Sequence, residues 1–143
     1  MRNNIDDLDR FILAQESVYH DVLYELRNGH KTSHWMWFIF PQIEGLGSSE
    51  TARYYSIKTK NEASQYLNHP ILGKRLIECT EIVFHIHGSS ASEIFGFPDD
   101  LKFKSSMTLF AAISKPESMF EKNIRKYFNA EFDNKTLKIL ENH

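Results

Sequence analysis

The stretch Ser33-His34-Trp35-Met36-Trp37-Phe38-Ile39-Phe40-Pro41-Gln42 contains both tryptophans of the chain. Its six central residues, 35–40, present an apolar side chain in every direction, whether they form a helical turn or a strand. Other elements must therefore cover this stretch, the aromatic segment, on all sides. We expect its middle to lie in the core and its polar ends, His34 and Gln42, to lie at the rim.

The composition indicates a single globular domain with an aromatic core. A chain of 143 residues buries roughly two thirds of the surface that its unfolded form exposes, and this one contains eleven Phe and six Tyr besides the two Trp. The net charge is −2, with acidic and basic residues interspersed. Because binding to nucleic acid or to an anionic membrane requires a basic field, neither is an expected partner.

The chain has one cysteine, Cys79, so it forms no internal disulfide and no multi-cysteine metal site. The N-terminus turns acidic where a signal peptide would be apolar, and no apolar run reaches the ~20 residues of a membrane span. We therefore expect a cytoplasmic protein, and we expect neither a metal ion nor a cofactor.

Apolar residues recur with helical spacing along most of the chain, and no segment shows sustained alternation of period two. One long amphipathic helix is predicted over residues 7–29 and another over residues 70–88. Ser90 and Glu93 form a capping box, and Asp133 can cap the last helix. The predicted fold class is all-α: residues 1–143 form one domain, a compact stack of about six to eight helices.

The first candidate site is the rim of the aromatic segment. His34 beside Trp35 and Trp37 is either an acid or base in a stacking pocket for a flat ligand, or an ordinary cap or buried histidine. Gln42 suits hydrogen bonding to a planar ligand edge, or it satisfies the loop backbone. The turn that contains Gly45 and Gly47 either offers backbone N–H groups to an anion or is a plain tight turn.

The second candidate site lies in the helix predicted after Pro98. Asp100 and Lys104 are one helical turn apart, and two interpretations are open. Either they form an ion pair on a solvated face of the helix, or this face meets the aromatic rim. In the latter case Asp100, Lys102 and Ser106 would contact a polar ligand. Gln15, on the apolar face of the first helix, is usually a structural amide in such a position, and a ligand contact is the alternative.

Three other groups of residues carry no predicted chemistry. His85 and His87 are two residues apart on a helix, so they point to different faces and do not chelate one metal. Cys79 lies on an apolar helix face, where a thiol is usually inert. No serine lies in a Gly-x-Ser-x-Gly motif, so a hydrolase of that type has no support.

Five motifs of the chain closely resemble the bacterial family registered as domain of unknown function 1810: the aromatic segment, Gly45-Leu46-Gly47, His69-Pro70-x-Leu72-Gly73-x-Arg75-Leu76, Ile94-Phe95-Gly96 and Asp99-Asp100-x-Lys102-x-x-Ser105-Ser106-Met107-Thr108-Leu109-Phe110. The resemblance runs from about residue 7 to residue 140. It implies an all-helical, armadillo-like domain and no established activity. Some members carry the label calpastatin, but calpastatin is a disordered chain, unlike this well-patterned one.

Three functional hypotheses follow. The leading one is an aromatic-rimmed cleft that binds a small polar or nucleotide-like ligand. A protein-interaction module with a concave helical surface and a protein partner is the second. The third is a hydrolase acting on ADP-ribose or nucleotide derivatives, with His34 or Asp100 as the acid or base. It draws on a looser similarity, since the helix after Pro70 and residues 96–108 are similar in order to a family acting on ADP-ribose derivatives.

Overall fold

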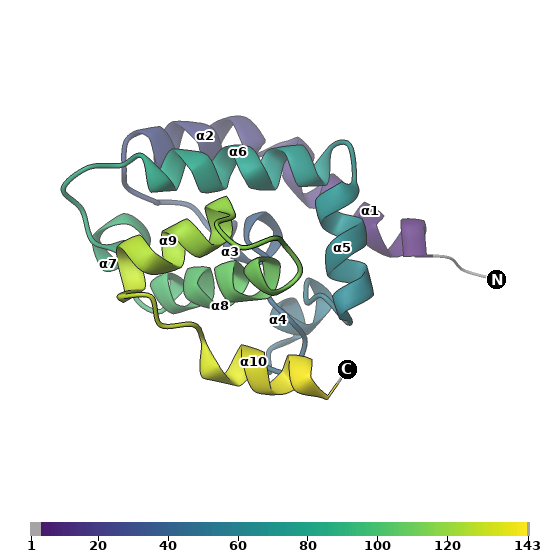
Figure 1. Cartoon of the computed structure of the whole chain (residues 1–143). Coiled ribbons are helices and arrows are strands. Elements are labelled where there is room, and N and C mark those ends of the chain that lie inside the picture. The colour runs from purple at the N-terminus through teal and green to yellow at the C-terminus, as the bar shows by residue number, and fades with distance from the viewer. Residues whose placement is uncertain (1–3, 143) are drawn as a thin grey trace.

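The structure, a computed structural model, describes residues 4–142, and in this range it contains ten helices and no strand (Figure 1). None of the described helices is both long and apolar enough to cross a membrane. The helices are α1 (Asn4–Glu16), α2 (Tyr19–Arg27), α3 (Met36–Ile39), α4 (Glu50–Tyr54), α5 (Lys60–Asn68), α6 (Leu72–Phe84), α7 (Ala91–Phe95), α8 (Asp99–Ala112), α9 (Met119–Phe128) and α10 (Asn134–Glu141).

The all-α class is confirmed, but the expected number of helices, six to eight, was too low. The single helix predicted over residues 7–29 is two helices, because the chain turns at Ser17 and Val18 between α1 and α2. Three further helices, α3, α4 and α7, have only four or five residues each. The capping box of Ser90 and Glu93 and the Asp133 cap are confirmed.

Helix α8 lies at the centre of the packing. It contacts α3, α5, α7, α9 and α10, and its residues from Ser105 to Phe110 are all buried. Figure 1 shows α2 and α6 side by side above α8 and α9, with α10 on the opposite side of α8. The first half of α8 lines a cleft together with the loop after α3 and the segment before α10.

The aromatic segment is core in its middle, as predicted. Trp35, Met36, Ile39 and Phe40 are at most 2% exposed, and the Phe40 ring makes edge contacts with two rings on α7 and α8. Only Trp37 and Phe38 of the six apolar residues are half-buried. Trp35, the residue before the four-residue helix α3, thus lies in the core, whereas Trp37, within α3, is half-buried and lines a cleft.

Candidate functional site

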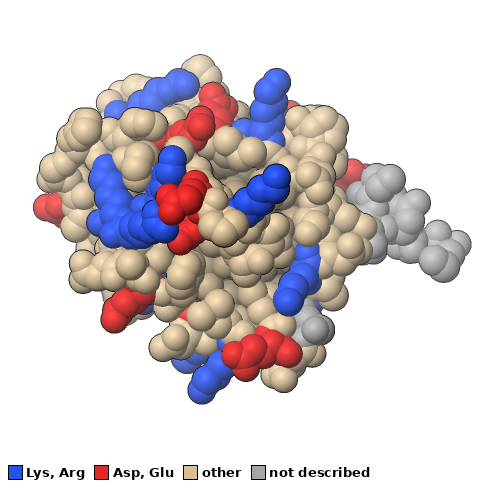
Figure 2. Space-filling model, viewed as in Figure 1, with Lys and Arg blue, Asp and Glu red and all other residues tan. Residues whose placement is uncertain are grey.

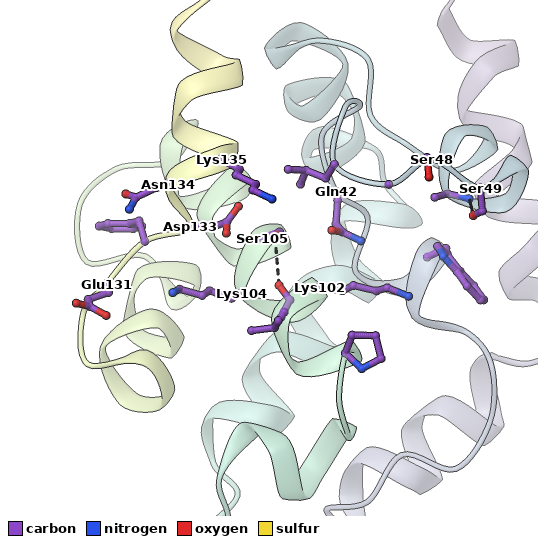
Figure 3. Close-up of a pocket in the computed structure, with 17 residues that line it drawn as sticks. Gln42, Ser48, Ser49, Lys102, Lys104, Ser105, Glu131, Asp133, Asn134 and Lys135 are labelled. Carbon is purple, nitrogen blue, oxygen red and sulfur yellow. Dashed lines mark hydrogen bonds between the residues drawn. The ribbon is translucent and has the colours of Figure 1, made fainter.

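A cleft of about 860 Å³ lies between the loop after α3, the start of α4, helix α8 and the segment that leads into α10 (Figure 3). Its walls come from segments far apart in the sequence, so tertiary packing assembles it. The lining residues are Trp37, Gln42, Leu46, Gly47, Ser48, Ser49, Ala52, Pro98, Leu101, Lys102, Lys104, Ser105, Glu131, Phe132, Asp133, Asn134 and Lys135.

One end of the cleft combines an indole, an amide and an ammonium group. The Lys102 Nζ lies 4.7 Å from the centroid of the Trp37 ring, a cation–π distance. Asp99 holds the same ammonium at 3.4 Å and also pairs at 2.8 Å with Lys31, whose side chain is only 7% exposed. Gln42 is half-buried and also lines this end. These groups can contact both a flat ring and polar ligand atoms.

The other end of the cleft is formed by Lys104 and by residues 131–135. Lys102 and Lys104 leave α8 in opposite directions, so their ammonium groups serve different ends of the cleft (Figure 3). Lys135, near the start of α10, also lines the cleft, and its ammonium group points toward Gln42 (Figure 3). Basic side chains from both α8 and α10 therefore line the cleft.

Two hydrogen-bonding side chains fix the start of α10, and one of them, Thr108, comes from α8. Thr108 Oγ1 accepts a hydrogen bond from the Asp133 backbone N–H at 2.9 Å. The Asp133 carboxylate caps α10 by accepting from the Thr136 backbone N–H at 3.0 Å and from its hydroxyl at 2.6 Å. This carboxylate is engaged in structure, although it lies in the cleft wall.

The loop on the opposite wall depends on a close backbone approach. A Cβ atom at Gly47 would lie only 2.7 Å from the Cβ of Ala52, so glycine is required there. The Ser49 hydroxyl accepts from the Ala52 backbone N–H at 3.1 Å and starts α4. The glycine turn is thus packed closely against the start of α4 and forms part of the wall.

Four of the residues proposed from the sequence, Trp37, Gln42, Gly47 and Lys102, line this cleft together. Gly45 lines a narrow hollow beside it, which also borders Gln42 and Gly47. These residues come from the aromatic rim, the glycine turn and the helix after Pro98. Of the two alternatives for the helix after Pro98, a solvated face or a face that meets the aromatic rim, Lys102 fits the second, because it lines the cleft with Trp37 and Gln42.

Three other proposed residues lie in the core. Gln15 is 1% exposed, and its amide donates to the Phe38 carbonyl at 2.7 Å and to the Tyr66 hydroxyl at 3.1 Å. Trp35 is 1% exposed, and Ser106 is fully buried. The role that the structure gives Gln15 is the structural one.

His34 and Asp100, the two candidate acids or bases, do not line the cleft. His34 is exposed, and Asp100 accepts a hydrogen bond from the adjacent Leu101 backbone N–H. Among the described residues, Asp100 and Lys104 form no ion pair, and the carboxylate that pairs with a lysine in this turn of α8 is that of Asp99, which contacts Lys102. Lys104 lines the cleft.

The sequence reasoning missed the contribution of α10. The packing of α10 against α8 brings three residues to the cleft, Asp133, Asn134 and Lys135. No local sequence pattern predicts this contact. Lys104 was named only as half of a surface ion pair. Within residues 8–142, no group of three or more His, Cys, Asp and Glu side chains suits a metal ion.

The fold and the cleft define a small all-α protein with a polar, partly aromatic cleft. The chain belongs to the family described as "Protein of unknown function (DUF1810)", which it matches over residues 5–140. Its structure is similar to the crystal structure of the conserved hypothetical protein Rv1873 from Mycobacterium tuberculosis, with a TM-score of 0.93 and 50% sequence identity over 94% of this chain and 96% of that one. No curated protein matches the chain. The family resemblance predicted from the motifs is confirmed.

Proposed function

We propose that this protein binds a small polar or nucleotide-like ligand in the cleft between α3 and α10, in the cytosol. The observation that carries the proposal is that Trp37 and Gln42 of the aromatic segment line one cleft of about 860 Å³ together with Lys102, which comes from the motif after Pro98. This volume lies within the range of roughly 300–1,000 Å³ that small-molecule sites occupy.

The chemistry of the lining suits such a ligand. An indole edge or face contacts a flat ring, and a primary amide pairs with a ring edge by donating and accepting at once. The ammonium of Lys102, which is paired with Asp99 and lies over the Trp37 ring, can donate a further hydrogen bond to a polar ligand atom. Lys102 lies on α8, and the Gln42 backbone carbonyl accepts a hydrogen bond from the Ile57 backbone N–H at 2.8 Å, so the backbone of both residues is held in place before a ligand binds.

The lining favours binding over hydrolysis. His34 and Asp100 lie outside it, and the Asp133 carboxylate is engaged in capping α10. The hydrolase alternative requires an acid or base at the reacting bond. Incubating the protein with ADP-ribose and separating the products tests this alternative. If no more ribose or nucleotide is released than in a control with boiled protein, the hydrolase alternative is excluded.

The second candidate is an interaction module, in which an armadillo-like stack holds a protein segment. The specific observation in its favour is that Phe97 and Leu101, beside the cleft, are 77% and 48% exposed. Exposed apolar side chains of this size often mark contact surfaces. A Phe97→Ser variant that loses a co-purifying protein would support this candidate.

The direct test of ligand binding uses the tryptophan fluorescence of the whole protein. Trp35 is 1% exposed, so a ligand-dependent change in emission reports mainly on Trp37. We expect adenosine or its phosphates to change the emission, and we expect Gln42→Ala to weaken that binding about tenfold through the loss of a buried hydrogen-bonding partner. Asn61→Ala, which changes an exposed amide on α5, is the matched control. An emission that none of these compounds changes, or one equally changed in Gln42→Ala, contradicts the proposal.

A further inference from the structure

We propose that Lys102 determines which flat ligands the cleft accepts: it selects nitrogen heterocycles that present a hydrogen-bond acceptor and disfavours rings that present none. This inference rests on the proposed function and names the ligand class of the same cleft. It is drawn from the position of the Lys102 ammonium over the Trp37 indole and from the ion pairs of Asp99.

The Lys102 ammonium lies where a ring stacked on Trp37 from the cleft would lie. Its Nζ is 4.7 Å from the centroid of the indole ring, and both side chains line the cleft. The face of an aromatic ring carries partial negative charge, so a cation and a flat ligand compete for it. A ligand that stacks on Trp37 must therefore displace this ammonium.

The ion pairs of Asp99 allow this displacement. The Asp99 carboxylate lies 3.4 Å from the Lys102 Nζ but only 2.8 Å from the Lys31 Nζ. The side chain of Lys31 is 7% exposed, whereas that of Lys102 is 27% exposed. Asp99 therefore keeps its closer and more buried partner when Lys102 moves. A partly exposed ion pair contributes little to stability, so the exchange of Lys102 costs little.

The displaced ammonium needs a new acceptor, and this requirement selects the ligand. An ammonium group has three donors and no acceptor. A ring nitrogen or a ring carbonyl can accept from it, and such a charge-assisted hydrogen bond is stronger than one between neutral groups. A ring without an acceptor removes the cation–π contact and replaces it with nothing. Gln42, which lines the same cleft, can pair with the polar edge of the same heterocycle.

The overall charge of the protein does not supply this selectivity. Figure 2 shows basic and acidic side chains interspersed on the face in view, and the net charge is −2. Interspersed charges of both signs screen one another at a distance, so long-range attraction has little influence on what binds. Individual contacts in the cleft, such as that of Lys102, decide it instead.

Isothermal titration calorimetry with adenine and indole tests the inference, because both have fused six- and five-membered rings but only adenine has ring nitrogens that accept hydrogen bonds. We expect the wild type to bind adenine at least about tenfold more tightly than indole. Lys102→Met, which removes the ammonium, should weaken adenine binding about five- to tenfold and strengthen indole binding about two- to threefold. Lys138→Met, an exposed change on α10 outside the cleft, is the matched control and should bind both compounds like the wild type.

The opposite signs of the two changes distinguish this selection from a loss of stability, which would weaken the binding of both compounds. Equal affinities of the wild type for adenine and indole, or affinities that Lys102→Met changes in the same direction, overturn the inference and leave the proposed function standing. If neither compound binds, both the inference and the proposed function fail.

Discussion

At the scale of single residues, the Glu25 carboxylate connects helix α2 to the start of the aromatic segment. Its carboxylate is 6% exposed and accepts hydrogen bonds from the Thr32 and Ser33 backbone N–H groups at 2.8 and 3.0 Å. The Ser33 hydroxyl and the Trp35 indole N–H, the latter at 2.9 Å, donate to it as well. One buried carboxylate thus satisfies four donors and fixes how the aromatic segment enters the core.

These donors determine how Glu25 titrates. Burial opposes its ionisation, but the hydrogen bonds from the Ser33 hydroxyl, the two backbone N–H groups and the Trp35 indole outweigh burial and lower its pKa to about 2. Because the pKa is lower in the folded than in the unfolded chain, the charged carboxylate stabilises the fold at neutral pH. This contribution is lost as the pH falls below the usual carboxyl range, near 4.5, toward 2.

Glu25→Gln should therefore lower the free energy of unfolding by about 1–3 kcal/mol at pH 7, because an amide replaces a charged acceptor for several buried donors. The difference from the wild type should shrink between pH 5 and pH 2, where the wild type loses the same contribution. Urea unfolding at a series of pH values measures both effects. Glu81→Gln, an exposed change on α6, is the control, and a difference between Glu25→Gln and the wild type that is independent of pH would contradict this account.

At the scale of elements, the turn between α5 and α6 depends on one glycine. A Cβ atom at Gly73, in the first turn of α6, would lie 1.9 Å from the carbonyl oxygen of Leu67 in α5. That oxygen belongs to helical backbone and cannot move as a side chain tip would. The two helices can approach this closely only because residue 73 has no side chain.

Gly73→Ala should destabilise the protein by about 2–4 kcal/mol, because α5 and α6 must separate to relieve the overlap. Thermal or urea unfolding measures the loss. Lys74→Ala, at the exposed next position, should change the stability by less than about 0.5 kcal/mol. Equal stabilities of Gly73→Ala and Lys74→Ala would show that the close approach of α5 and α6 is not required.

The same elements show what the sequence could predict. Periodicity and capping residues revealed the helical class, the α7 capping box and the start of α10, because these features depend on neighbours three or four residues away. The break between α1 and α2 has no glycine or proline to signal it, and it was missed. The cleft was predicted only in part: Trp37, Gln42 and Lys102 lie in distinctive motifs, whereas Lys135 enters through the packing of α10 on α8, which local patterns do not encode.

At the scale of the whole molecule, the fold separates the two tryptophans that the sequence places two residues apart. Trp35 is held in the core by Glu25, and Trp37 faces the cleft with Lys102. In the proposed function this cleft is the ligand site, and the rest of the aromatic segment supports it. A ligand in the cleft should therefore affect one indole and leave the other unchanged.

Fluorine NMR of the protein labelled with 5-fluorotryptophan tests this claim most directly, since the chain has only two tryptophans and each gives one resonance. A Trp37→Phe variant assigns the two signals. On titration with ADP, we expect the Trp37 resonance to shift and saturate and the Trp35 resonance to keep its position. A spectrum in which neither resonance moves, or in which only the Trp35 resonance moves, would contradict the account.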